Sequence, residues 1–271
     1  IEEGTGVERR RFLSSTLAAS ALAAGAATRT LRAAESKGRE YYELRRYRLT
    51  SGPQHELTNN YLRSALVPAL NRMGMSPVGV FSVTIGPESS TIVVLIPSSS
   101  VEALATAPFR LERDPEYQKA GAAFLEAPAK EPAYVRVESS LMAAFAGKPK
   151  LAAPPVTAAH GARVFELRTY ESPSDRDHRR KIEMFHSGEF DIFQTAGFWQ
   201  VFYGDTLIGP RMPNLTYMLG FPSLSERDAK WKAFFSAPEW KKLTGSTRFN
   251  FESIVSNVDN LILTPTAYSQ I

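Results

Sequence analysis

Two short segments of the chain repeat one pattern of chemically active side chains, Glu-Leu-Arg-x-Tyr. In an extended strand every second side chain lies on the same face, so the glutamate, arginine and tyrosine of each copy share a face. An arginine there can bind an anion, and a phenol can transfer a proton. The candidate substrate-binding residues are Glu43, Arg45 and Tyr47 in the first copy and Glu166 and Arg168 in the second, with Tyr170 as a candidate catalytic residue.

Two histidines recur at the same spacing as this pattern. His55 and His178 are 123 residues apart, and each lies near the start of a predicted helix. An imidazole that titrates near neutral pH could act there as a base, which makes His178 the second candidate catalytic residue. The alternative is a solvated histidine without a chemical role.

Metal and cofactor chemistry has weak support in the sequence. His186 with Glu183 and Glu189 could form part of a metal site, but the chain has four histidines and no cysteine. We therefore predict no metal and no cofactor. Haem has little support, since no histidine is clearly placed on an interior strand.

Aromatic residues and glycine patterns narrow the chemistry further. Trp199 and Tyr203 belong to an aromatic segment that is mostly core, and they are the candidates for lining an apolar pocket. The glycines form no phosphate loop, dinucleotide fingerprint or Gly-x-Ser-x-Gly elbow. Nucleotide use and nucleophilic hydrolysis are therefore disfavoured.

The elements that must position these residues occur twice, because five blocks of sequence repeat in register at an offset of 123 residues. Besides the two features above, Met73-Gly74-Met75 matches Ala196-Gly197-Phe198, Ile85-Gly86-Pro87 matches Ile208-Gly209-Pro210, and Pro115-Glu116-Tyr117 matches Pro238-Glu239-Trp240. Such agreement indicates a duplicated domain. We predict domains over 40–146 and 162–271, joined by a linker over 147–161 that is rich in Ala, Pro and Lys.

Each half reads as strand, helix, strand, strand, helix, strand. In the first half we expect strands over 40–49, 78–84, 91–96 and 134–145, a helix over 54–73, and a second helical region through Phe124 with a break near Pro108. The second half has strands over 163–170, 198–203, 215–221 and about 257–263, with helices over 175–196 and 225–242. This order is the ferredoxin-like plan, an α+β fold.

Two ferredoxin-like sheets can bury their bare faces against each other, which predicts an α/β barrel with a central space. We expect the polar Glu, Arg and Tyr face to point into the barrel or the seam between the sheets, and the alternate face to lie against the helices. That alternate face carries Tyr42, Leu44 and Arg46, and Phe165, Leu167 and Thr169. An alternative stays open: a buried Glu–Arg pair that holds the sheets in register, with tyrosine as packing.

Composition and the N-terminal segment bound the partners and the compartment. The chain is 22% charged with a formal net charge of +4, and no Lys/Arg cluster lies among aromatics, so nucleic acid is not an expected partner. Residues 1–34 carry paired arginines, then Phe12-Leu13 and an Ala-rich run. They resemble a twin-arginine signal with a cleavage site between Ala24 and Ala34, which predicts a periplasmic or secreted protein without stable membrane insertion after processing.

The repeated blocks resemble the NIPSNAP family over about residues 41–145 and 163–264. The second half matches best, through Gly197-Phe198-Trp199, Ser225-Glu226-Arg227 and Pro238-Glu239-Trp240, whereas the first half has Pro77-Val78 in place of an aromatic and Tyr117 in place of Trp. The resemblance implies the dimeric α/β-barrel variant of the ferredoxin-like fold, and it favours the second half as the one with a working site. Superfamily relatives include monooxygenases, haem-degrading enzymes and chlorite dismutases, but fold alone does not transfer an activity.

The function that we expect from these features is binding of a small apolar or aromatic molecule in the barrel. The expected function includes a reaction of this molecule, either cofactor-independent oxygenation or proton transfer. In that reaction Glu166, Arg168 and Tyr170 would hold the substrate and His178 would act as the base. The alternative is a non-catalytic interaction module, and a homo-oligomer fits either function. The sequence does not decide whether the protein is an enzyme.

Overall fold

The computed structural model describes residues 38–50, 52–87 and 90–271, and Glu40–Ile271 form one compact unit. The predicted signal over residues 1–34 lies outside the described residues. In the described part of the chain, no helix has the length and apolar character that crossing a membrane requires.

The first half follows the predicted order. Its strands are β1 (Tyr41–Arg48), β2 (Gly79–Ile85), β3 (Thr91–Ser98) and β4 (Arg136–Ala144). Between β1 and β2 lies one continuous helical segment made of α2 (Pro53–Tyr61), the π-helical turn η1 (Leu62–Leu66) and α3 (Val67–Arg72). Gly74 follows that segment with φ 78°, a conformation that only glycine adopts without strain, as its predicted role at the helix end requires.

The break in the second helical region of this half lies later than predicted. Pro108 lies inside α4 (Val101–Leu111), and α5 (Pro115–Leu125) begins after a separate start signal. The Asp114 carboxylate accepts hydrogen bonds from the backbone N–H groups of Glu116 and Tyr117, and Pro115 occupies the first helical position. A capping aspartate followed by proline begins a new helix more strongly than one internal proline ends the old helix.

The second half repeats this order. Its strands are β5 (Val164–Glu171), β6 (Trp199–Ile208), β7 (Asn214–Phe221) and β8 (Asn257–Pro265). Its helices are α6 (Asp175–Met184), the π-helical turn η2 (Phe185–Glu189), α7 (Phe190–Thr195), α8 (Leu224–Ser236), α9 (Pro238–Thr244), the 3-10 turn η3 (Thr247–Phe249) and α10 (Phe251–Ile254). The two π-helical turns fall at the repeat offset of 123 residues, so this irregularity belongs to the duplicated unit.

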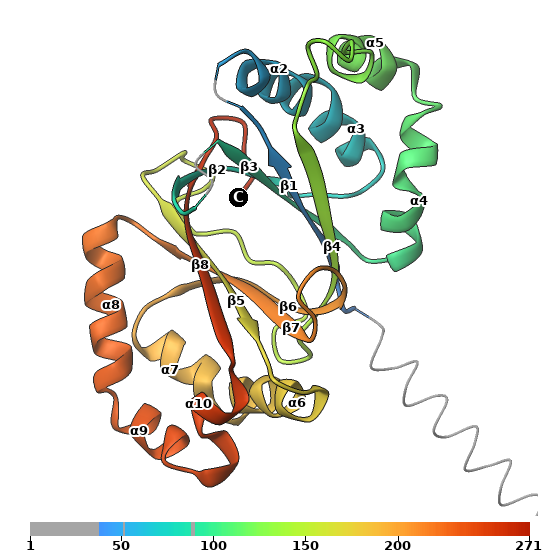
Figure 1. The fold of residues 1–271 in the computed structure, drawn as a ribbon. Coiled ribbons are helices and arrows are strands. Elements are labelled where there is room, and N and C mark those ends of the chain that lie inside the picture. The colour runs from blue at the N-terminus through green and yellow to red at the C-terminus, as the bar shows by residue number, and fades with distance from the viewer. Residues whose placement is uncertain (1–37, 51, 88–89) are drawn as a thin grey trace, which may run out of the picture. The chain divides into compact units, whose positions relative to one another are not determined.

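The eight strands of the described residues close into a barrel in the order β1-β3-β2-β8-β5-β7-β6-β4, with antiparallel neighbours throughout. The pairs β2–β8 and β4–β6 join one half to the other. The predicted α/β barrel of two ferredoxin-like halves is therefore confirmed. Figure 1 shows the helices of the two halves covering opposite sides of this barrel.

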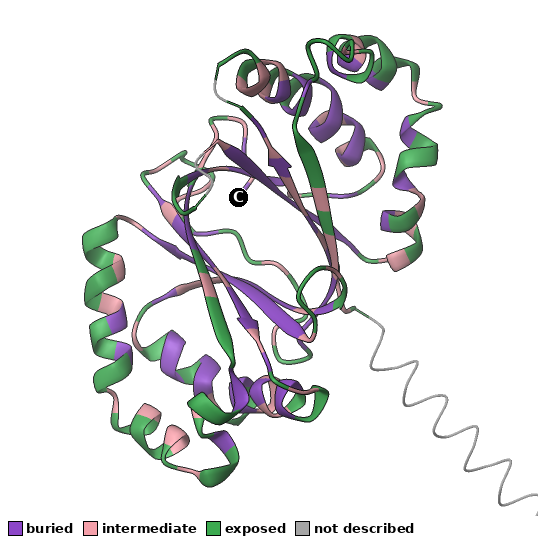
Figure 2. Cartoon of the chain, viewed as in Figure 1, coloured by how far each residue is buried: buried purple, intermediate pink, exposed green. Residues whose placement is uncertain are grey.

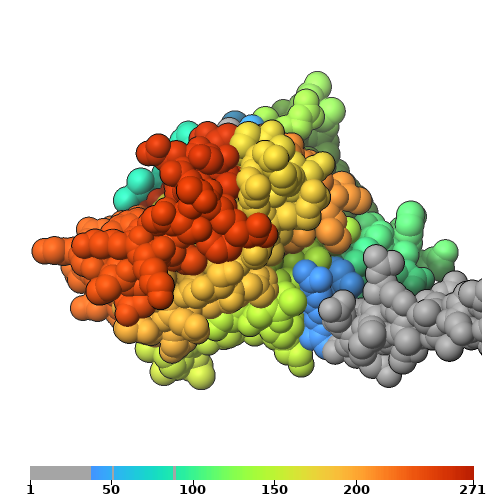
Figure 3. Space-filling view, turned by 90° about the horizontal axis from the view of Figure 1, so that it is seen from below, coloured from blue at the N-terminus to red at the C-terminus, as the bar shows by residue number. Residues whose placement is uncertain are grey.

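Three apolar clusters hold the unit together. One lies beneath the helices of each half, and the third gathers inward-facing residues of both halves, among them Tyr42, Leu44, Phe165 and Leu167. Residues along β3 and β7 are buried on both faces, as Figure 2 shows by the purple of these strands. Figure 3 views the molecule from the side of the second-half helices, where the yellow segment of α6 lies against the red segment of α10.

Candidate functional site

The two repeated strands turn their polar face outward, toward the helices. Tyr47 packs with α2 and η1 residues, and Tyr170 packs with Met184 and Phe185. The alternate face of β1 and β5 fills the barrel interior. The predicted orientation was therefore wrong for Glu43, Arg45 and Tyr47, and for Glu166, Arg168 and Tyr170.

The physical reason lies in where partners for polar groups are available. A closed barrel interior is the driest space in the fold and receives the more apolar face, whose polar residues Arg46 and Thr169 lie at one end. The outer face lies under helices, whose side chains can supply hydrogen bonds. With large side chains such as Phe81, Phe165 and Phe202 fully buried in the interior cluster, the predicted central space is filled.

Glu166 is the centre of a buried hydrogen-bond network in the second half. Its Oε1 accepts hydrogen bonds from Arg168, Arg227 and Asn260, each at 2.7 Å. Its Oε2 accepts from Arg227 Nε at 2.8 Å and from the Trp231 indole at 2.7 Å. Five donors fill the acceptor sites of one carboxylate.

This network sets the charge of Glu166. Burial alone would raise the pKa of the carboxyl, but hydrogen bonds from Arg227 and the charge of Arg168 hold that pKa below its ordinary value. Glu166 is thus ionised and saturated, and it ties β5 to α8. The predicted substrate-binding pair, Glu166 and Arg168, lies together, but its hydrogen bonds go to the protein.

The first half holds a smaller version of this arrangement. Arg45 donates to Glu43 at 2.6 and 3.0 Å, and the Ser139 hydroxyl donates to Glu43 at 2.7 Å. Leu104 and Pro108 occupy the repeat positions of Arg227 and Trp231, so α4 has no charged donor at these places.

Two buried tyrosines lie next to the Glu166 network. The hydroxyls of Tyr170 and Tyr217 are 2.7 Å apart, and Arg168 Nε donates to the Tyr170 hydroxyl at 3.3 Å. Burial raises the pKa of both phenols, so both are protonated at neutral pH. Tyr170 can therefore serve as a hydrogen-bonding group, and as a base only at high pH.

The other two aromatic candidates lie apart from this pair. Tyr203 is fully buried in the same cluster and donates its hydroxyl to Gln200 at 2.9 Å. Trp199 is half-buried at the first residue of β6, with the Lys230 ammonium 5.7 Å from its ring centroid. Neither residue lines the groove described below.

His178 is held by an acidic partner on the sheet. Its Nε2 lies 2.7 Å from Asp205 Oδ1, which joins the first turn of α6 to β6. Its Nδ1 is buried and has no hydrogen-bond partner within the described residues. His55 instead lies 3.1 Å from Asn59 on its own helix. The histidines therefore share a position in the repeat but not an environment.

A buried ion pair beneath α6 and η2 was missed by the sequence analysis. Lys181 Nζ lies 2.6 Å from Glu189 Oε2, and both side chains are almost fully buried. The ammonium lies 4.4 Å from the centroid of the Phe185 ring. Burial lowers the pKa of Lys181 and raises that of Glu189, in each case against the attraction of the partner. The sequence repeat could have revealed this pair, because the first-half residues at the same two positions, Thr58 and Leu66, are uncharged.

The residues considered for a metal site turn to separate partners. Glu189 pairs with Lys181, Glu183 with Arg248, and His186 Nε2 accepts from the Gly147 backbone N–H. No group of three or more His, Asp or Glu side chains able to hold a metal ion occurs in residues 38–50, 52–87 and 90–271.

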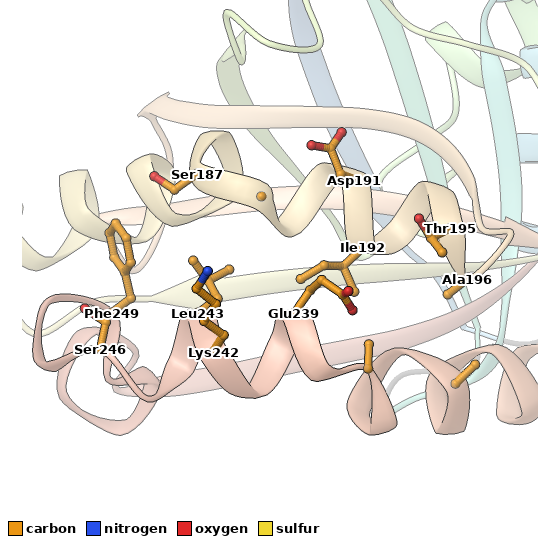
Figure 4. Close-up of a pocket in the computed structure, with 13 residues that line it drawn as sticks. Ser187, Asp191, Ile192, Thr195, Ala196, Glu239, Lys242, Leu243, Ser246 and Phe249 are labelled. Atoms are coloured by element: carbon orange, nitrogen blue, oxygen red, sulfur yellow. The ribbon is translucent and has the colours of Figure 1, made fainter.

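A groove of about 610 Å³ opens between two helical segments of the second half. Figure 4 shows it between η2–α7 on one side and α9 on the other, with Ile192 and Leu243 projecting into the space. The lining is apolar at Ile192, Ala196, Ala233, Ala237, Leu243 and Phe249, and polar at Ser187, Asp191, Thr195, Glu239, Lys242 and Ser246. A pocket of this size and mixed lining suits a small organic molecule.

The groove exists because the helices of the second half pack less closely than their counterparts. In the first half, Gly121 of α5 packs against η1, where an added Cβ would lie 3.4 Å from Ala65 Cβ. In the second half Gly188 occupies the repeat position of Ala65, and an added Cβ there would meet no atom within 4 Å. The helix α9, with 7 residues, is also shorter than α5, with 11.

Comparison with known proteins gives a family and a shared fold. A sequence model of the NIPSNAP family matches residues 42–146 and again 163–270, and no curated protein matches the chain. Among solved structures, a candidate monooxygenase from Lactobacillus acidophilus has a TM-score of 0.53 at 9% identity, covering 84% of this chain and 94% of its own. A candidate monooxygenase from Fusobacterium nucleatum has a TM-score of 0.54 at 8% identity, covering 84% and 93%. A NIPSNAP-like domain protein from Burkholderia xenovorans is 22% identical over 41% of this chain and 90% of its own, with a TM-score of 0.37.

Proposed function

Since the chain belongs to the NIPSNAP family, whose model matches both halves, we propose that it binds a small, largely apolar or aromatic molecule in the groove of the second half. The observation that carries the proposal is the open 610 Å³ space between α7 and α9, where the first half is closely packed. The barrel centre, where the sequence placed the ligand, is filled by side chains of both halves.

The side chains that line the groove indicate which kind of molecule can bind there. Ile192, Leu243 and Phe249 offer an apolar surface for an aliphatic or aromatic body. Asp191, Glu239 and Lys242 at the rim can orient one or two polar substituents. Two carboxylates against one ammonium favour a neutral or cationic ligand over an anionic one.

We further propose that the protein catalyses a reaction of the bound molecule. The fold is shared with two candidate monooxygenases, which makes oxygenation without a cofactor, or proton transfer, the reaction classes to test. Glu239 projects from α9 into the groove and is the group positioned to accept a proton there, whereas the Asp191 carboxylate points away from α9 (Figure 4). Oxygen uptake in the presence of a captured ligand, lost in a Glu239→Gln variant, would support catalysis.

The groove is tested with paired alanine-to-tryptophan variants of α8. Ala233 lines the groove, whereas Ala229, one turn earlier on the same helix, is exposed and does not line it. A neutral apolar fluorophore, N-phenyl-1-naphthylamine, should bind the wild-type chain saturably with one site. We expect Ala233→Trp to weaken this binding at least tenfold and Ala229→Trp to leave it unchanged.

Either of two results would reject the groove as the site. The first is equal binding by both variants, and the second is the absence of saturable binding by the wild type. Native mass spectrometry of protein from its own host adds an independent readout: a reproducible adduct that Ala233→Trp abolishes supports the proposal. A clean unliganded mass at a defined oligomeric state would instead favour the interaction module.

We also propose that the protein is exported from the cytoplasm by its N-terminal segment. Replacing Arg9 and Arg10 by lysine should abolish this export, which cell fractionation measures.

A further inference from the structure

The two ends of the barrel differ in how they are closed. At one end the C-terminal Ile271 is fully buried, and its carbonyl accepts hydrogen bonds from Arg163 at 3.1 and 3.3 Å. Leu151 of the linker packs on the interior cluster at that end, and Pro154 lies against Gly220. The end is therefore plugged by apolar side chains.

The other end, where β1, β2, β5 and β6 finish, is polar and open. A cavity of about 400 Å³ lies there between residues of both halves, and a smaller one of about 30 Å³ lies next to it, lined in part by Leu44, Ser140 and Thr169. Both cavities are lined by Arg46, Glu138, Pro210 and Arg211. We call this space the barrel vestibule.

Charged side chains of both signs line the barrel vestibule. The lining contains the three arginines Arg46, Arg48 and Arg211 and the two acids Glu138 and Asp259. Arg48 pairs with Glu138 at 3.3 Å, and Arg211 pairs with Asp259 at 2.8 Å and with Glu171, outside the lining, at 3.0 Å.

Among these three arginines, Arg46 has the weakest contact with a carboxylate. Its nearest acid is Asp259 at 3.9 Å, beyond hydrogen-bond distance, and it makes no hydrogen bond within the described residues. On the outer face of β1 and β5, Arg45 and Arg168 pair with glutamates at 2.6 and 2.7 Å. Burial lowers the pKa of Arg46, with Asp259 opposing this and Arg211 adding to it. A partly buried guanidinium that lines a cavity and has unused donors can bind an acceptor there.

We propose that the barrel vestibule binds a small organic monocarboxylate, whose carboxylate group accepts hydrogen bonds from Arg46. The planar guanidinium matches a carboxylate with two parallel hydrogen bonds, and no carboxylate of the described residues lies within hydrogen-bond distance of it. Val83, Pro87 and Leu261 of the same lining give an apolar surface for a short hydrocarbon or aromatic body. The vestibule is separate from the α7–α9 groove and shares no lining residue with it.

Two variants with opposite expected effects test this site. Arg46→Gln removes the proposed ligand of the carboxylate, and Asp259→Asn removes the acid that competes for Arg46. In isothermal titration calorimetry with benzoate, we expect Arg46→Gln to raise the Kd at least tenfold. Asp259→Asn should lower the Kd several-fold, since Glu171 still holds Arg211. A merely structural role for these residues would not move the affinity in opposite directions.

Further measurements show where on the protein benzoate binds and which class of anion the vestibule prefers. Ala233→Trp, which fills the α7–α9 groove, should leave the benzoate Kd unchanged, and a loss there would place the anion in the groove and overturn the proposal. Tighter binding of inorganic phosphate than of benzoate would overturn the carboxylate assignment. The absence of saturable benzoate binding by the wild type, or an unchanged Kd in Asp259→Asn, would reject the site. Circular dichroism checks folding, and the Asp259→Asn arm decides alone if Arg46→Gln is unfolded.

Discussion

The two halves of the barrel share one frame but hold different chemistry beneath their helices. The first half has Thr58 and Leu66 where the second half has the buried pair of Lys181 and Glu189. Glu43 accepts from two side chains, whereas Glu166 accepts from Arg168, Arg227, Asn260 and Trp231. Duplication of the frame allows one half to keep an ordinary core while the other carries a polar network and an open groove.

The difference extends to how tightly the helices pack. In the first half Tyr61 and Phe124 stack with ring centroids 3.9 Å apart, which binds α5 to α2. In the second half the matching helix ends at Thr244, and the space beside it becomes the groove. The half with more buried charge is therefore also the half with open space, the combination expected where function opposes stability.

The largest expected difference between the halves concerns the two glutamates. Glu166→Gln removes a fully buried negative charge and leaves Arg168 and Arg227 facing a neutral amide, which should cost about 3–5 kcal/mol of unfolding free energy. Glu43→Gln affects one partly exposed pair and should cost about 1 kcal/mol. Urea unfolding followed by circular dichroism measures both. Equal losses would show that the network of Glu166 adds nothing beyond its pair with Arg168.

The orientation of these glutamates marks the limit of what could be predicted from the sequence. Strand alternation places Glu166, Arg168 and Tyr170 on one face, as the structure confirms, but alternation does not say which face is inside. The deciding groups are Arg227 and Trp231, more than sixty residues away in the chain. The fold was predictable because two copies of each element agreed in register.

The second prediction concerns the buried ion pair of Lys181 and Glu189, which two substitutions replace by uncharged residues as in the first half. Lys181→Met alone leaves Glu189 buried without its partner and should cost about 3 kcal/mol. Adding Glu189→Leu, the residue of the first half, should recover most of this loss or exceed it, because both desolvated charges are then gone. Denaturant unfolding of the three proteins measures the coupling between the two positions.

The pH dependence of the Lys181→Met variant sharpens this prediction. Burial raises the pKa of Glu189 above its ordinary value of 4.5, and losing the ammonium removes an opposing effect. A carboxyl with a raised pKa binds its proton more tightly in the folded state. The stability of the variant should therefore be greatest below pH 4.5 and decline as the pH rises through the folded-state pKa of Glu189. A loss that is independent of pH between 4 and 8 would show that Glu189 finds another donor and is not raised in pKa by losing Lys181.

The sequence favoured the second half, where we propose the groove as the site, but it did not point to the space between α7 and α9. The weaker match of the first half to the NIPSNAP pattern pointed to the second, and the exchange of Thr58 and Leu66 for Lys181 and Glu189 could have marked the buried pair. The groove could not be found in this way. It depends on where α9 ends and on the distance between α7 and α9, which the packing of the whole half determines.

The smallest expected difference concerns the tyrosines that follow the two arginines. Tyr170→Phe removes the hydroxyl that pairs with Tyr217 at 2.7 Å and leaves a buried hydroxyl without that partner, which should cost about 1 kcal/mol. Tyr47→Phe, at the same place in the first half, should cost less, because its neighbour at the position of Tyr217 is Val94. Neither change should alter binding of N-phenyl-1-naphthylamine, since neither residue lines the groove. If Tyr170→Phe instead abolished binding at unchanged stability, the phenol would contact the ligand, and the site would lie beneath α6 and not between α7 and α9.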